Sequence, residues 1–293
     1  MANLRRIART NLASFEATAC APKMLTDLLG ILALLIPFAL TGLLVEAFHV
    51  AQARQSGYTR NLALNVLCTI LYFAGDMVAG TFFSFCLAKL IRALPGAGVF
   101  ALPTPDRLTP LYVVGVTALW LAIGDFFNYW WHRLQHTSTW LWAQHEVHHS
   151  DEHLNVTSAY RHHWLESPFK TVAMVAPITY LFVPVPAIAA TVSLTGLGLT
   201  FFAHMNARIG FGPLNWILLT PQMHRIHHSR ESEHRDRNFA FIFPLWDVLF
   251  GTYYHPHSIE YPATGLASGE KLVTPWQAIA WPFLRWSGRT SKL

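Results

Sequence analysis

Histidines gather in three groups whose spacing suits metal binding. The chain holds 16 histidines in 293 residues, and eight of them fall in these groups. On an α-helix, residues at positions i, i+3 and i+4 share one face, so an HxxxH pair offers two ligands and an HxxHH triplet offers three. The groups are one pair and two triplets: His132 and His136; His145, His148 and His149; His224, His227 and His228. Eight imidazoles on three helices would suit two metal ions.

The type and number of these ligands narrow the choice of metal. Imidazole binds zinc, copper, iron and nickel alike. A structural zinc site needs only four ligands, and a haem usually takes one axial histidine from a helix, so neither explains eight clustered histidines. Buried imidazoles without partners would be unfavourable, which favours metal binding over chance clustering. We therefore expect a dinuclear, non-haem iron centre that activates O₂.

The composition indicates that membrane helices position these histidines. The chain is 53% hydrophobic and 13% charged, against a usual charged share of roughly 25%. Apolar runs at about 24–48, 62–91 and 109–131 are long enough to span a bilayer. A fourth stretch, 168–204, is split by Val-Pro-Val-Pro at 183–186 and predicts a helical hairpin. The predicted fold class is all-α: an integral membrane helical protein with a histidine-rich di-metal site at the membrane surface.

The apolar runs divide the chain into three regions. Residues 1–108 form an N-terminal membrane region, 109–260 hold the histidines, and 261–293 form an irregular tail. Residues 1–23 are basic and predict either an amphipathic surface helix or a frayed tail. In the C-terminal tail, three tryptophans are expected at the membrane interface: Trp276, Trp281 and Trp286.

The distribution of charge bears on location and partners. The net charge of +5 is attributed to basic loops facing the cytoplasm, and no nucleic-acid partner is expected. A basic N-terminus favours a cytoplasmic start, yet three full crossings would then place the first histidines outside. One re-entrant run, or an external N-terminus, would return them to the inside. We expect a metal site on the cytoplasmic side of a bacterial inner membrane.

Four polar residues outside the histidine groups are candidates for orienting the ligands. Asp125 lies two helical turns before His132, so its carboxylate could accept an imidazole N–H. Asp247 could orient a ligand or cap its own helix. The four candidates are Asp125, Asn206, Asn238 and Asp247. Glu146 lies inside a histidine triplet but on a different helix face, which favours a surface position.

The histidine groups and the residues around them resemble the fatty acid hydroxylase/sterol desaturase superfamily. The resemblance covers about Leu119 to Tyr254 and includes HxxxH, HxxHH and HxxHH in this order, with a membrane hairpin before the last. The other matching motifs are Arg161-x-His163-x-x-Glu166, His204-x-Asn206, Gly212-Pro213-Leu214-Asn215, Thr220-Pro221-x-x-His224-Arg225-x-His227-His228-Ser229, Asn238-Phe239, Leu245-Trp246-Asp247 and Phe250-Gly251-Thr252-Tyr253. Trp164 departs from the pattern, because the family often has proline at this position.

This resemblance implies a membrane di-iron oxygenase that uses O₂ and two electrons to hydroxylate or desaturate a lipid C–H bond. It adds His204 and His163 to the eight metal ligands. His162 is the alternative to His163. We favour His163, because of its register with Glu166. The implied cofactor is two Fe ions, with O₂ as co-substrate.

The implied partners are a lipid substrate from the bilayer and a separate electron donor. No flavin- or nicotinamide-binding motif and no haem module is recognised, so electrons would come from a reductase, ferredoxin or cytochrome. The alternative function is a histidine-rich membrane metal-binding or transport protein without oxygenase activity. Such a protein needs ionisable residues inside its spans, and only Asp76 lies deep in an apolar run.

Overall fold

The structure, a computed structural model, describes residues 21–49, 51, 57–102 and 107–288. Within these ranges the chain is nearly all helical, no β-strand forms, and only two isolated β-bridges occur. The predicted all-α class is confirmed. The predicted surface helix at 1–23 falls almost entirely outside the described residues.

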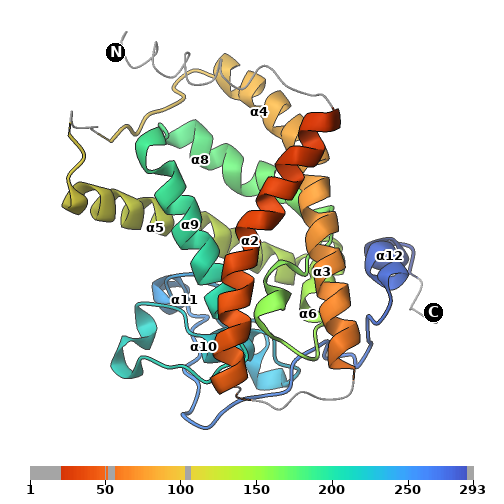
Figure 1. The fold of residues 1–293 in the computed structure, drawn as a ribbon. Coiled ribbons are helices and arrows are strands. Elements are labelled where there is room, and N and C mark those ends of the chain that lie inside the picture. The colour runs from red at the N-terminus through yellow and green to blue at the C-terminus, as the bar shows by residue number, and fades with distance from the viewer. Residues whose placement is uncertain (1–20, 50, 52–56, 103–106, 289–293) are drawn as a thin grey trace.

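The helices differ widely in length. The longer ones are α2 (Ala21–His49), α3 (Tyr58–Gly75), α4 (Thr81–Ala93), α5 (Pro110–Thr137), α6 (Thr139–His149), α9 (Pro186–Ala203) and α12 (Pro275–Trp286). The short segments are η1 (Asp76–Gly80), η2 (Val156–Tyr160), α7 (Glu166–Lys170), η3 (Thr171–Val175), α8 (Ala176–Leu181), η4 (Gly212–Trp216), α10 (Pro221–His227), η5 (Ser232–His234) and α11 (Leu245–Phe250). Figure 1 shows α4 and α8 at one end of the molecule and α10 and α11 at the other.

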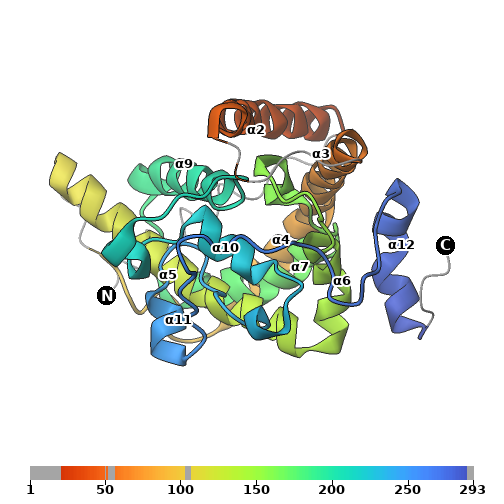
Figure 2. The same ribbon diagram turned by 90° about the horizontal axis from the view of Figure 1, so that it is seen from below.

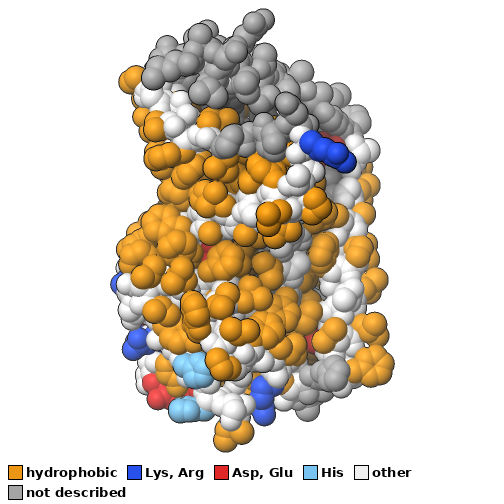
Figure 3. All heavy atoms as spheres, turned by 90° about the vertical axis from the view of Figure 1, so that its left-hand side faces the viewer, with side chains coloured by type: hydrophobic (Ala, Val, Ile, Leu, Met, Phe, Trp, Pro, Cys, Tyr) orange, Lys and Arg blue, Asp and Glu red, His pale blue; other side chains and the backbone are white. Residues whose placement is uncertain are grey.

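Four helical segments are long and apolar enough to cross a membrane. They are Leu25–Phe48, Tyr58–Ile91, Pro110–Thr137 and Pro186–Ala203. Only 11% to 22% of their most apolar windows is buried inside the protein, so most of this apolar surface needs lipid to cover it. Hydrophobic side chains dominate the face drawn in Figure 3, and most of its visible charged and histidine side chains lie at the lower end. The chain is an integral membrane protein.

The second apolar run bends at Asp76. Residues 76–80 form a wider π-helical turn between α3 and α4. The Ser167 hydroxyl donates a hydrogen bond to the Asp76 carboxylate. A Cβ at Gly80 would lie 2.5 Å from Asp76 Oδ1, so a larger residue here would displace the Asp76 carboxylate. Asp76 therefore faces protein rather than lipid, as expected for an acidic residue in an apolar run.

The apolar stretch after the second histidine group turns at its prolines, as the sequence predicts. α8 ends at Leu181, and Pro186 begins α9, where its missing N–H leaves no helical hydrogen bond unmade. The first arm is irregular: α7, the π-helical η3 and α8 follow one another. Pro177 cannot donate to residue 173, which explains why residues 171–175 depart from α-helical winding. Of these two arms, only α9 is long enough to span a bilayer.

The ends of α5, α6 and α9 meet at the polar end of the molecule. α5 packs against both α6 and α9, and α10 packs against α9. Seen from below, α10 lies near the middle of this end with α9, α5 and α6 around it (Figure 2). All three histidine groups are carried by these helices, so the packing of long apolar helices positions the histidines.

Part of the C-terminal tail is helical, which corrects the prediction of an irregular tail. Residues 275–286 form α12, and this helix packs against α6. The Trp281 indole is buried and donates to Glu146 Oε2 at 2.7 Å, and Arg285 Nε donates to the same oxygen at 2.7 Å. The expected surface position of Glu146 is therefore wrong, and Trp281 is not interfacial. Trp276 is 66% exposed, as expected for an interfacial side chain.

Candidate metal centre

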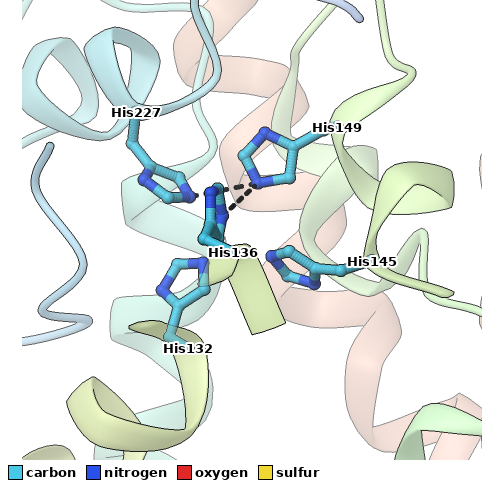
Figure 4. Close-up of side chains that lie close together, drawn as sticks. All are labelled: His132, His136, His145, His149 and His227. Atoms are coloured by element: carbon cyan, nitrogen blue, oxygen red, sulfur yellow. Dashed lines mark hydrogen bonds between the residues drawn. The ribbon is translucent and has the colours of Figure 1, made fainter. Parts of the chain in front are cut away.

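Nine histidines converge into two adjoining groups. Within each group, one nitrogen from every imidazole lies within 4.8 Å of the others. Group 1 contains His132, His136, His145, His149 and His227. Group 2 contains His148, His204, His224 and His228. Figure 4 shows the five rings of group 1 pointing toward one another from α5, α6 and α10.

Each HxxHH triplet is divided between the two groups. His145 and His149 belong to group 1, whereas His148 belongs to group 2. Consecutive helical residues point about 100° apart, so the two histidines of an HH doublet face different centres. The rings of His149 and His228 lie 4.4 Å apart between their centroids, which places the two groups side by side. The sequence predicted each triplet as one ligand face, and the structure instead forms two centres that share both triplets.

The spacing of the facing nitrogens fits ligands around a metal ion. In group 1, Nε2 of His149 lies 3.2 Å from Nε2 of His136 and 3.1 Å from Nε2 of His227. In group 2, Nε2 of His224 lies 3.0 Å from that of His204 and 3.2 Å from that of His228. Two imidazole nitrogens at roughly 2.0–2.1 Å from a metal and at right angles would be roughly 3 Å apart.

Backbone carbonyls fix the tautomers of three of these histidines. His132 Nδ1 donates to the Phe239 carbonyl at 2.8 Å, and His227 Nδ1 donates to the Arg237 carbonyl at 2.9 Å. His204 Nδ1 donates to the Thr200 carbonyl at 2.8 Å. Since a carbonyl only accepts, Nδ1 carries the proton and Nε2 presents its lone pair to the group. Metal-binding histidines are commonly oriented in this way.

Imidazole nitrogens without a proton face one another in both groups. Their lone pairs repel one another unless a cation lies between them. Nε2 of His204 and Nε2 of His224 are 3.0 Å apart. His132 Nε2 and both ring nitrogens of His145 are buried with no hydrogen-bond partner. Buried polar atoms without partners are unfavourable by about 1–3 kcal/mol each. A metal ion in each group would satisfy one nitrogen of each imidazole, and the Nδ1 of His145 lies 3.6 Å from Glu166 Oε2. The residues therefore fit the two metals that the sequence predicts.

Burial keeps these imidazoles neutral at physiological pH. It lowers the pKa of His204 to about 4 and that of His227 to about 3, although the hydrogen bonds to backbone carbonyls oppose this shift. Burial, together with the neighbouring imidazoles, holds the pKa of His148, His149 and His228 well below the usual range. Neutral imidazoles are the form that binds a metal.

These shifts predict that the metal-free protein is destabilised by acid. The unfolded chain takes up protons at these histidines near pH 6.5, whereas folded His204 resists protonation until about pH 4. Stability is therefore lost as the pH falls from about 6.5 toward 4. We expect the melting temperature of chelator-treated protein in detergent to drop across this window, followed by differential scanning fluorimetry. An unchanged melting temperature between pH 7 and 5 would contradict the buried, neutral state of these side chains.

His163 belongs to neither group, which corrects the expectation for this residue. Its Nε2 donates to the Ile279 carbonyl at 3.1 Å, and its Nδ1 accepts the Leu165 N–H at 3.2 Å. His162 lies beside the centre instead: its ring stacks on His148 with centroids 4.2 Å apart. Its Nδ1 donates to Glu166 at 3.0 Å. The i, i+4 spacing of His162 and Glu166 was the signal in the sequence that could have identified this pair.

Asp125 and Asp247 act on the centre through one loop rather than through an imidazole. The Asp125 carboxylate accepts the backbone N–H groups of residues 241, 242 and 243 at 2.7 to 3.1 Å. Asp247 accepts those of Phe239 and Ala240 at 2.7 and 2.9 Å. The Phe239 carbonyl in this loop orients His132. The expected direct contact between Asp125 and a histidine does not occur.

Asn206 and Asn238 shape the backbone near the histidines. Asn206 Oδ1 accepts the Tyr261 hydroxyl, and its backbone N–H donates to Glu46. Asn238 has a φ of 55°, a left-handed conformation that asparagine tolerates better than most residues. Its amide donates to the carbonyls of Met223 and Tyr254. These contacts hold the loops beside the ligands.

Glu46 is a buried residue beside the centre that the sequence reasoning missed. It lies near the end of α2 and is only 3% exposed. One of its oxygens accepts the N–H groups of Val156 and Asn206 at 2.7 and 2.8 Å. Asn206 follows His204 by two residues, so Glu46 ties a membrane helix to the backbone beside group 2. No local pattern predicts this contact, because its partners lie 110 and 160 residues away.

The fold and the centre together define a helical membrane protein with two adjoining histidine groups. The fatty acid hydroxylase family model matches residues 117–252, a range that contains all nine histidines of both groups. Residues 117–252 therefore form a fatty acid hydroxylase domain, as the sequence motifs indicated. No solved structure matches the chain.

Several curated proteins are similar to parts of the chain. Ornithine lipid hydroxylase OlsE of Rhizobium tropici is 32% identical over 209 residues, which cover 69% of this chain and 60% of that protein. Alkylglycerol monooxygenase of Homo sapiens is 36% identical over 129 residues, covering 44% of this chain and 28% of that protein. Very-long-chain aldehyde decarbonylase GL1-6 of Oryza sativa subsp. indica is 27% identical over 139 residues, covering 44% and 21%. The chain thus spans less than two thirds of the length of each of these relatives.

Proposed function

We propose that the chain is an O₂-dependent di-iron oxygenase that hydroxylates or desaturates a C–H bond of a membrane lipid. The observation that carries this proposal is the pair of adjoining groups of five and four buried histidines. The match of residues 117–252 to the fatty acid hydroxylase family and the similarity to proteins named as lipid hydroxylases and monooxygenases support it.

In this proposal each histidine group holds one iron. Group 1 supplies five imidazoles and group 2 supplies four, and His162 with Glu166 lies beside both His145 and His148. Oxidation of an unactivated C–H bond requires activated O₂. Two bound irons would supply this activation, with two electrons from the electron donor. Sites built from carboxylates suit harder metals such as magnesium, calcium or manganese, whereas imidazole suits iron as well as zinc, copper and nickel.

The residues of the chain keep the reaction site dry and fixed. All but one of the nine histidines are buried, and His136 is nearly so. The carbonyls of Phe239, Arg237 and Thr200 hold three imidazoles in one tautomer and one orientation. A fixed polar environment of this kind needs little reorganisation during reaction. Burial also protects a strong oxidant from water.

The proposed substrate is a lipid, and the proposed location follows from the apolar helices. The site adjoins helices α5 and α9, which qualify as membrane spans. We place the metal centre at the membrane surface, on the cytoplasmic side of a bacterial inner membrane, with a separate electron donor. A metal transporter is less well supported, since the histidines cluster at the polar ends of the helices instead of lining a path along the spans.

Iron content and a lipid comparison test this function. Protein purified in detergent without added chelator is expected to contain about two Fe per chain, matching the two groups. Membrane lipids of cells with and without the gene are then compared by mass spectrometry under air. A lipid gaining one oxygen, or losing two hydrogens, only in the presence of the gene would support the proposal. Iron-loaded protein with a supplied electron donor that leaves every lipid unchanged would contradict it.

A further inference from the structure

A cavity of about 390 Å³ lies between the membrane helices next to the histidine centre. This volume is in the range of small-molecule ligand sites. α2, α5 and α9 form most of its wall, with contributions from α3, η2, α7, η3 and the loop at 241–242. Leu34 on the α2 wall is 47% exposed at the surface of an apolar helix, so the cavity is bordered by a lipid-facing side chain.

The two ends of this cavity differ in chemistry. The end near the histidines carries polar side chains: Asn128 is one helical turn before His132, and Thr200 is one turn before His204. The remainder is mainly apolar and is lined by Ile31, Leu34, Leu35, Leu121, Val192 and Leu197. An elongated amphiphile would therefore place its polar end next to the metal centre and its tail among these apolar side chains.

Lys170 supplies the only lysine or arginine side chain in the described wall of this cavity. It lies one turn after Glu166, the residue that bonds to His162 beside the centre. Within the described part of the chain, Lys170 forms no ion pair. The acidic groups around it are engaged elsewhere: Asp76 accepts the Ser167 hydroxyl, and Glu166 accepts from His162. The Asp125 carboxylate, which also lines the cavity, accepts three backbone N–H groups.

A cation in such a place is unusual and calls for a counter-charge. Charged side chains in membrane segments are unfavourable unless they meet an opposite charge or water, and they commonly mark binding sites. Asp76 and Glu166 balance part of the charge at longer range, but neither provides a direct contact. The cavity leaves room for an anion to do so.

We propose that Lys170 binds the oxyanion headgroup of a long-chain lipid whose tail fills the apolar part of the cavity. The inference rests on the proposed function, because it names the substrate class of the same site. It also sets the region of oxidation: the headgroup lies at the polar end near the histidines, so the carbons oxidised are those near the head rather than the far end of the tail. A carboxylate and a phosphate would both provide the required oxyanion.

A binding measurement tests this assignment without turnover. Iron-loaded protein is kept anaerobic without an electron donor, and quenching of its tryptophan fluorescence by 9,10-dibromostearate is followed, since Trp120 lines the cavity. Three ligands are compared: dibromostearate, the corresponding brominated alkyl phosphate and the brominated alcohol. We expect at least one oxyanion to bind about tenfold more tightly than the alcohol, as a charge-assisted hydrogen bond predicts, and the stronger arm identifies the headgroup.

Three variants decide whether Lys170 causes the preference. Lys170→Met should reduce the ratio of oxyanion to alcohol binding to about one while leaving alcohol binding unchanged, and Lys170→Arg should retain the preference. Lys271→Met, at a 59% exposed lysine paired with Glu152, controls for net charge and should bind like the wild type. A wild-type protein without preference, or a Met variant that keeps it, overturns the assignment and leaves Lys170 as a counter-charge to Glu166 and Asp76. Binding as expected, without lipid oxidation in the aerobic experiment, would contradict the proposed function alone.

Discussion

Replacing His227 with alanine is expected to release the metal of group 1 and to abolish lipid oxidation. The His227 ring lies in this group, with Nδ1 fixed by the Arg237 carbonyl and Nε2 facing His149 at 3.1 Å. Loss of residues that merely support a ligand typically lowers metal affinity or activity by about 10- to 100-fold, so loss of a ligand should exceed about 100-fold. Iron per chain, measured by inductively coupled plasma mass spectrometry, should fall from about two to about one.

A parallel variant in the other group makes this prediction sharper. His204→Ala should also lower the iron content by about one, but from group 2, and the double variant should hold almost none. His257→Ala provides the control, because this histidine is exposed and belongs to neither group. Two irons and full activity in either single variant would remove the basis for assigning these histidines as ligands. Loss of both irons in each single variant would show one coupled centre.

The histidine groups were predictable because helical spacing is a local property. A run such as His145, His148 and His149 predicts side chains on one side of a helix before any tertiary contact is known. The division of each triplet between two centres was not predictable in this way. It depends on where α10 and the end of α9 lie relative to α6, and this is determined by packing between segments about 60 to 80 residues apart.

His162 and His163 show how a local ambiguity is resolved by tertiary structure. Both are within one turn of Glu166 in sequence, and both follow a buried arginine in the same motif. α12 decides between them, because the Ile279 carbonyl of this helix binds His163 and turns its ring away from the centre. The sequence treated the tail as irregular, so it offered no partner for His163.

The prediction of a surface position for Glu146 is wrong for the same reason. Its position on a different helix face from the ligands is compatible with either solvent or protein, and the sequence favoured solvent. Its partners Trp281 and Arg285 lie on α12, 135 and 139 residues later.

The four apolar helices were easier to predict, since length and hydropathy alone identify them. Long-range polar contacts therefore account for most of what the sequence left open.

Replacing Asp125 with alanine is expected to destabilise the protein and to weaken metal binding at His132 together. The side chain is 1% exposed, and its two oxygens accept three backbone N–H groups from residues 241 to 243. Each buried donor left without an acceptor is unfavourable by about 1–3 kcal/mol, so the total loss should be about 3 kcal/mol or more. That is a large part of a typical stability of roughly 5–15 kcal/mol. The loop would then no longer hold the Phe239 carbonyl against His132.

Asp125→Asn separates the role of the hydrogen bonds from that of the charge. Oδ1 accepts two of the three N–H groups and Oδ2 accepts the third. An asparagine that keeps its oxygen at the Oδ1 position would satisfy two donors and place its own N–H groups against Phe243. We expect melting temperature and iron content to fall in the order wild type, Asn, Ala, with the exposed Asp27→Asn as an unaffected control. An alanine variant as stable and as iron-rich as the wild type would show that the loop at 239–243 is held by Asp247 and packing alone. In that case the membrane helix α5 would contribute His132 and His136 to the centre, but it would not position the loop that orients them.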